Sequence, residues 1–176
     1  RGQYTNGTID GKAVPGYLEE AGVQPDSSTE TYAALKVFID NWRWSGVPFF
    51  IRTGKRLPVT QTELRVVFKQ PPRLGFGLHG SRRPEPGQLV VRLDPSTGIR
   101  LRFNARRAGS RIPETIHLDM EFAEEGGEGP TPYEVLLHAA MVGHIMRFTR
   151  QDGVEETWRI MQPLLDAPPP VHQYAQ

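Results

Sequence analysis

A short basic turn contains the residues of this sequence that could do chemistry most directly. Residues 48–52 predict a strand, and Thr53-Gly54-Lys55-Arg56 follows it. Gly54 can let the backbone turn tightly where the strand ends, so that Lys55 and Arg56 project from a rigid element. A lysine placed in this way can meet a phosphate or sugar oxygen with a compact, full positive charge. The alternative is an ordinary solvated lysine, as most loop lysines are.

Arginines gather in the strand-rich region that follows this turn. Arg100 and Arg102 alternate along one predicted strand and therefore share a face, while Arg65 and Arg92 lie on other strands. Several guanidinium groups on one sheet could bind a phosphate through paired hydrogen bonds. The alternative is a solvated face that acids such as Asp119 balance. The remaining arginines of this region are Arg106, Arg107 and Arg111.

A glycine-rich loop, residues 75–80, matches the G-x-G-x-x-G pattern of dinucleotide-binding folds. Such a site needs a strand before the glycines and a helix after them, because the pyrophosphate binds at the helix N-terminus. Here Pro71-Pro72 precedes the loop, and residues 81–86 follow it with two further prolines. The sequence therefore predicts an ordinary loop and no Rossmann-type nucleotide fold in this chain.

The histidines do not form a pattern that suits metal binding or nucleophilic catalysis. His138 and His144 are six residues apart in a predicted helix, on different faces. His117 and Asp119 share one strand face, and a pocket that joined them with Lys55 would indicate a separate catalytic centre. The sequence has no cysteine, which excludes disulfides and thiolate chemistry. We expect no metal site and no catalytic residue in this chain.

Short strands are predicted to position these residues. Alternating apolar and polar residues, joined mostly by turn-rich links, are typical of antiparallel strands. Residues 1–30 are rich in Gly, Pro, Ser and Asp and are predicted mostly as loop. The first predicted strand could also be a helix, because it contains two adjacent alanines. The predicted strands are residues 31–40, 48–52, 62–69, 88–92, 98–103 and 115–122.

Two helices are predicted after the strands. An apolar stripe over residues 133–148 predicts the first, with Thr131 as its cap. Asp152 and Glu155 predict a capping box for the second, which Pro163 bends or ends. Strands followed by helices indicate an α+β fold, a large and mostly antiparallel β-sheet with helices packed on one face.

Composition is that of a soluble globular protein. The 176 residues suffice for one domain, with 38% hydrophobic and 23% charged residues. A formal net charge of +1 gives no reason to expect a nucleic-acid partner, and no apolar run is long enough to span a membrane. The sequence begins at Arg1 without a starting Met, which suggests a segment of a longer protein, and the absence of cysteine is consistent with a cytoplasmic one.

Longer segments are more specific than any of these short motifs. They occur in one order along the chain, at residues 1–4 (RGQY), 16–18 (GYL), 29–34 (TETYAA), 42–58, 118–120 (LDM), 132–134 (PYE) and 158–165 (WRIMQPLL). In residue types and order they resemble the glucose-6-phosphate dehydrogenase family, and the match spans nearly the whole chain.

The resemblance implies the C-terminal domain of such an enzyme over residues 1–176, with a sheet that pairs two copies in a homodimer. The implied reaction is the NADP-dependent oxidation of glucose 6-phosphate to 6-phosphogluconolactone, in the pentose phosphate pathway. NADP and the catalytic histidine would belong mainly to an N-terminal Rossmann domain that this chain lacks, so the fragment alone is expected to be inactive. Lys55 is the implied substrate contact. The alternative is a non-catalytic dimerisation or interaction module.

This sequence departs from the family near both implied sites. Thr60 stands five positions after Lys55, where the family often has a second basic residue near the substrate. Some family members hold a structural NADP on this domain, and Gln61 replaces one basic residue expected there. The other residues implied for this second nucleotide or anion site are Arg65, Arg92, Arg102 and Asp119.

Overall fold

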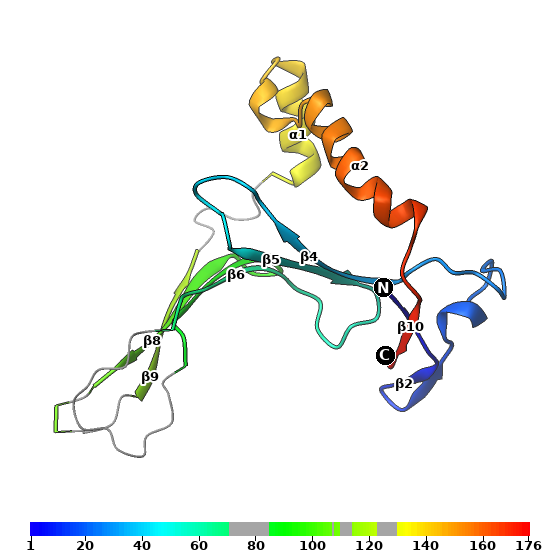
Figure 1. Ribbon diagram of the computed structural model, residues 1–176, viewed down its shortest axis with the longest axis horizontal. Coiled ribbons are helices and arrows are strands. Elements are labelled where there is room, and N and C mark those ends of the chain that lie inside the picture. The colour runs from blue at the N-terminus through cyan, green and yellow to red at the C-terminus, as the bar shows by residue number, and fades with distance from the viewer. Residues whose placement is uncertain (71–84, 107, 110–113, 123–129) are drawn as a thin grey trace. The chain divides into compact units, whose positions relative to one another are not determined.

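The computed structural model describes residues 1–70, 85–106, 108–109, 114–122 and 130–176. The described elements fall into two compact units, Arg1–Pro58 with Pro132–Gln176 and Val59–Thr131. Strands occur in both units and the helices in the first (Figure 1), which confirms the predicted α+β class. The glycine-rich loop and two of the arginines, Arg107 and Arg111, lie outside the described residues.

The first unit contains a four-stranded sheet in the order β10-β1-β4-β5. β4 (Tyr32–Phe38) and β5 (Pro48–Gly54) pair antiparallel along their whole lengths, as the sequence predicts. β1 (Gly2–Tyr4) lies antiparallel to β4 and parallel to β10 (His172–Tyr174). The two ends of the described chain therefore lie in neighbouring strands of one sheet.

The predicted loop over residues 1–30 is wrong in part, because this region also forms a two-stranded ribbon. β2 (Gly7–Ile9) pairs antiparallel with β3 (Lys12–Val14). Asp10 and Gly11 join them with φ values of 50° and 75°, the left-handed conformations of a type I′ hairpin turn. A single 3₁₀ turn, η1 (Tyr17–Glu19), follows the ribbon.

Both predicted helices form, with different ends. α1 (Pro132–Met141) stops well before the end of its apolar stripe, because Gly143 adopts φ 70° and the chain continues into η2 (Ile145–Arg147). α2 (Gln151–Asp166) contains Pro163 and continues for three residues beyond it, so this proline does not end the helix.

The predicted capping box of α2 is wrong. Arg150 is the N-cap residue and makes no capping hydrogen bond with its side chain. Asp152 lies within the first turn, where its carboxylate pairs with Arg150 at 2.6 Å. Apolar residues of both helices, among them Leu137 and Trp158, remain exposed. The packing of helices on one sheet face therefore stays a prediction.

The second unit contains a four-stranded antiparallel meander in the order β6-β7-β8-β9. Its register separates two kinds of side chain, because alternate residues of a strand point to opposite faces. One row across the sheet is Leu64, Val91, Ile99 and Met120, so this face is apolar. The strands are β6 (Thr62–Val67), β7 (Gln88–Asp94), β8 (Gly98–Ala105) and β9 (Glu114–Glu121).

The opposite face of this sheet is charged. Val90 on β7 lies between its two cross-strand partners, Arg65 on β6 and Arg100 on β8. Asp119 on β9 is in turn the cross-strand partner of Arg100. Val90 is one of very few buried hydrophobic residues in the described part of the chain. The sheet thus presents a charged face and an apolar face instead of a closed core.

Candidate functional site

The basic turn begins where β5 ends, and the side chain of Tyr32 is the reason that position 54 needs a glycine. A Cβ atom on Gly54 would lie 2.6 Å from Cδ2 of Tyr32, its cross-strand partner in β4. The sequence-based reason, a tight backbone turn at Gly54, is wrong. The left-handed residue of the turn is Arg56, with φ 52°, whereas Gly54 is outside the positive-φ region. The glycine provides space for an aromatic ring.

Both backbone polar groups of Lys55 are hydrogen-bonded. Its amide donates to the carbonyl oxygen of Thr31 at 2.8 Å. Its carbonyl oxygen accepts a hydrogen bond from the hydroxyl of Tyr174, also at 2.8 Å. Tyr174 belongs to β10 and Thr31 directly precedes β4, so two strands distant in sequence fix the turn. Sequence reasoning assigned no role to either residue.

The guanidinium of Arg56 is directed to a different set of partners. It pairs with the carboxylate of Glu20 at 3.3 Å and lies 5.9 Å from the ring centroid of Tyr4. The hydroxyl of Tyr4 donates to the same carboxylate at 3.1 Å. Burial and then Glu20 raise the pKa of the Tyr4 phenol, and contacts with Tyr4 and then Glu20 raise the pKa of Arg56. Arg56 is thus a structural cation of the turn.

Lys55 is the cation that the turn leaves available. Its side chain is exposed, and its ammonium makes no hydrogen bond or ion pair with any residue that the structure describes. An ammonium without an internal partner keeps all three donors for a ligand. The structure therefore places this predicted site residue on a fixed backbone with a free charged end.

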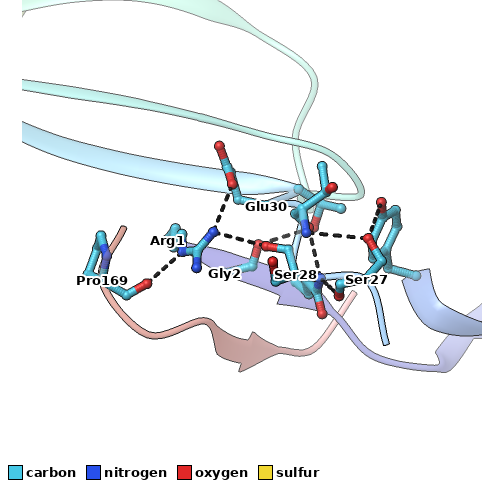
Figure 2. A network of polar contacts seen from close by, with 10 residues as sticks. Arg1, Gly2, Ser27, Ser28, Glu30 and Pro169 are labelled. Atoms are coloured by element: carbon cyan, nitrogen blue, oxygen red, sulfur yellow. Dashed lines mark hydrogen bonds and ion pairs between the residues drawn. The ribbon is translucent and has the colours of Figure 1, made fainter. Parts of the chain in front are cut away.

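A polar network around Arg1 joins the start of β1 to the segments that precede β4 and β10 (Figure 2). Arg1 donates from Nε to the carbonyl oxygen of Pro169 at 2.6 Å, just before β10. Its Nη1 donates to the carbonyl oxygen of Ser28 at 3.0 Å and pairs with Glu30 at 3.3 Å. The side chain of Gln3, which is buried, donates to two carbonyl oxygens of the same loop. One arginine thus joins three segments that are distant in sequence.

The arginines predicted to cluster do come together, on the charged face of the second unit. Arg65, Arg92, Arg100 and Arg102 line a cavity of about 540 Å³. Most of their charge is balanced by acids: Arg65 pairs with Glu63 and Arg100 with Asp119, each at 2.6 Å, and Arg102 pairs with Glu85. Thr60, Gln61 and His117 also line this cavity.

Arg92 is also paired with an acid, but it differs from the other three arginines in having buried donors without a partner among the described residues. Its Nη1 pairs with Glu121 at 3.3 Å, but its Nε and Nη2 are buried without a hydrogen-bond partner in the described part of the chain. A Cβ atom on Gly98 would lie 2.8 Å from this Nη2, so the guanidinium lies close against the backbone of β8. Buried donors without partners are costly, and a bound anion could reach them only if this guanidinium moved away from the backbone of β8.

His117 and Lys55, two of the residues named for a separate catalytic centre, belong to different units. His117 lines the cavity of the second unit, and Lys55 is not among the lining residues. Within the described ranges, no group of three histidine or acidic side chains is arranged to hold a metal ion. None of the described helices has the length and apolar character needed to cross a membrane.

Together these features define an α+β domain with two cationic sites, a lysine on a fixed turn and an arginine-lined cavity. The family model for the glucose-6-phosphate dehydrogenase C-terminal domain matches residues 1–176, and the chain belongs to this family. The resemblance found in the sequence is therefore confirmed.

Similar proteins agree with this assignment. Glucose-6-phosphate 1-dehydrogenase 1 of Mycobacterium tuberculosis (strain H37Rv) is 51% identical over 159 residues, covering 90% of this chain and 34% of the relative. The crystal structure of the Mycobacterium avium enzyme matches with a TM-score of 0.80 and 47% identity, over 100% of this chain and 35% of that one. A glucose-6-phosphate dehydrogenase in complex with its substrate glucose-6-phosphate matches with a TM-score of 0.81 and 32% identity, over 99% and 37%. The chain spans about a third of the length of the relatives it matches.

The close contact at Gly54 predicts that Gly54→Ala lowers the melting temperature of the full-length protein. The new methyl group would force Tyr32 or the strand end to move, at a cost of about 1–3 kcal/mol. Thermal unfolding followed by circular dichroism measures the change.

Gly153→Ala is the matched control. Gly153 lies in helix α2, and a Cβ atom there would meet nothing closer than Cγ2 of Thr149 at 3.8 Å. This substitution should leave the melting temperature unchanged or raise it, since alanine favours a helix interior. Equal melting temperatures for wild type and Gly54→Ala would show that Tyr32 does not constrain this position.

Proposed function

We propose that this chain is the C-terminal domain of a cytoplasmic glucose-6-phosphate 1-dehydrogenase. In the full-length enzyme it would serve the NADP-dependent oxidation of glucose 6-phosphate to 6-phosphogluconolactone. Relatives of this name match the chain along 90% of its length, and one solved relative holds glucose-6-phosphate as its substrate. The observation that carries the proposal is the free ammonium of Lys55 on a turn with hydrogen bonds to both backbone groups.

Lys55 acts in this proposal as a substrate contact. Its ammonium offers a full charge and three donors to an oxygen of the phosphate or the sugar. The nicotinamide cofactor supplies the hydride acceptor, and hydride transfer needs the sugar held in one orientation against it. Because the backbone of Lys55 is fixed, the entropy lost on binding the substrate is that of its side chain and not of the turn. The residue binds and orients, and the catalytic base is expected on the N-terminal domain.

The arginine-lined cavity supports a second proposal, a nucleotide or anion site on the same domain. Its volume of about 540 Å³ lies within the range of ligand pockets. Arg92 has two donors without a hydrogen-bond partner in the described part of the chain, and Arg65 and Arg102 also line the cavity, each paired with an acid. Asp119 orients Arg100 instead of facing the ligand. A phosphate group of NADP would supply the hydrogen-bond acceptors that the arginines of this cavity can bind.

The apolar face of the second unit supports the proposal of a homodimer through the sheet. Leu118 is 56% exposed and Met120 59%, and both lie on the face away from the arginines. Leu64 and Val66 on β6, the opposite edge strand of the sheet, are exposed on the same face. A continuous apolar sheet face of this kind marks a protein interface. A purely non-catalytic interaction module would use the same face, so Lys55 distinguishes the two proposals.

In the full-length enzyme, Lys55→Ala should raise the Michaelis constant for glucose 6-phosphate about tenfold to hundredfold. This range corresponds to the loss of one hydrogen bond to a charged group. Steady-state kinetics with varied substrate measures it, and Lys12→Ala, an exposed lysine on β3, is the control. An unchanged constant in Lys55→Ala would favour the non-catalytic module.

Arg92→Met should remove the second nucleotide site while it keeps a side chain of similar length. Calorimetric titration of the full-length enzyme with NADP should give two sites per subunit for wild type and one for the variant. Arg43→Met, on an exposed loop of the first unit, should keep both sites. The same stoichiometry in wild type and Arg92→Met would refute this site.

Leu118→Glu should dissociate the homodimer, because it introduces a charge into the apolar sheet face. Sedimentation velocity at micromolar concentration should show a dimer for the wild-type enzyme and a monomer for this variant. His117→Glu, on the opposite face of the same strand, should remain dimeric. A wild-type monomer, or a Leu118→Glu dimer, would exclude this interface.

A further inference from the structure

Tyr174 is joined to the basic turn by a chain of hydrogen bonds with one direction. We propose that Tyr174 is a positioning residue that holds the backbone of Lys55 in its binding orientation. This inference rests on the proposed function of Lys55 as a substrate contact and deepens it.

Each hydroxyl has one proton to donate, and this sets the direction of the chain of hydrogen bonds. The phenol of Tyr174 has a single proton, and the carbonyl oxygen of Lys55 at 2.8 Å is a better acceptor than that of Thr31 at 3.3 Å. The hydroxyl of Thr31 then donates to the Tyr174 oxygen at 2.9 Å in preference to the carbonyl oxygen of Gly2 at 3.4 Å. It also accepts from the amide of Tyr4 at 3.1 Å. Each bond polarises the next, and the chain ends on Lys55.

The last bond of this chain controls the peptide group between Lys55 and Arg56. Rotating that peptide plane would change φ of Arg56, which is 52° and therefore in a region that residues with a Cβ atom avoid. A rotated peptide would relieve Arg56 but would remove the carbonyl oxygen of Lys55 from the Tyr174 hydroxyl. Tyr174 thus holds the peptide in the orientation that Arg56 alone would not adopt.

The preceding peptide group is held as well. The amide of Lys55 donates to the carbonyl oxygen of Thr31 at 2.8 Å. With the peptide planes on both sides fixed, the direction in which the Lys55 side chain leaves the backbone is fixed too. Its ammonium is then directed by the turn, and the loss of one hydrogen bond at Tyr174 would spread it over more positions.

The ring of Tyr174 is held separately from its hydroxyl. Its centroid lies 5.7 Å from that of Tyr32 and 6.4 Å from that of Tyr4. A Cβ atom on Gly2 would lie 3.1 Å from its Cδ1 atom, so the ring rests on the backbone of β1. Tyr174→Phe therefore removes the hydrogen bond and leaves the packing in place.

The test is Tyr174→Phe in the full-length enzyme, by steady-state kinetics. We expect the Michaelis constant for glucose 6-phosphate to rise about two- to tenfold, the equivalent of one neutral hydrogen bond. The Michaelis constant for NADP and the melting temperature should change little. Tyr17→Phe is the control, because Tyr17 packs on Tyr4 at 5.9 Å and its hydroxyl lies 3.4 Å from Ser27, away from Lys55.

The double variant Tyr174→Phe/Lys55→Ala separates positioning from a general structural effect. If Tyr174 acts through Lys55, the double variant has the Michaelis constant of Lys55→Ala alone. Two additive increases, or an unchanged constant in Tyr174→Phe beside a raised one in Lys55→Ala, would overturn the positioning role only. An unchanged constant in Lys55→Ala would overturn the proposed function itself.

Discussion

The parallel pairing of β10 with β1 is the constraint on which the basic turn depends. This pairing aligns Tyr174 with Tyr4 across the two strands. β4 pairs antiparallel with the other side of β1, which places Thr31 next to Tyr174. β5 pairs antiparallel with β4, and Lys55 directly after its end therefore lies next to Tyr174 as well. Residues separated by more than a hundred positions in the sequence therefore meet at one hydroxyl. The ion pair and hydrogen bonds of Arg1 keep the strand ends together (Figure 2).

Two cations next to each other in the sequence have different roles because their surroundings differ. Arg56 has a left-handed backbone conformation, and its guanidinium is fixed by Glu20 and Tyr4. Among the residues that the structure describes, Lys55 forms hydrogen bonds through its backbone only. The planar guanidinium suits a fixed structural contact, and the compact ammonium suits a ligand that arrives and leaves. A turn of this kind combines rigidity with an available charge.

The alternation of apolar and polar residues was sufficient to predict much of the second unit. The pattern of β8 and β9 places Arg100 and Arg102 on one face, and the observed register adds Arg65 and Arg92 to it. The vacant donors of Arg92 could not be predicted, because they depend on how closely the guanidinium approaches Gly98. The same alternation predicts the apolar face, whereas the sequence alone does not say what covers it.

The first unit was harder to predict, for a physical reason. Strands of three residues such as β1 and β10 are too short to show a period, and their pairing is decided by contacts distant in sequence. Tyr174 therefore could not be assigned a role, and Gly54 was assigned the wrong one. The Asp10-Gly11 dipeptide, by contrast, is a recognisable sequence signal for a hairpin turn. Specific segments predicted the family where periodicity could not predict the pairing of these short strands.

The central claim is that Lys55 binds the substrate directly. A crystal structure of the full-length enzyme with bound glucose 6-phosphate tests it. We expect Nζ of Lys55 at about 2.8 Å from an oxygen of the phosphate or the sugar, the distance of a charge-assisted hydrogen bond. A lysine that points into solvent, with no substrate oxygen in reach, would contradict it.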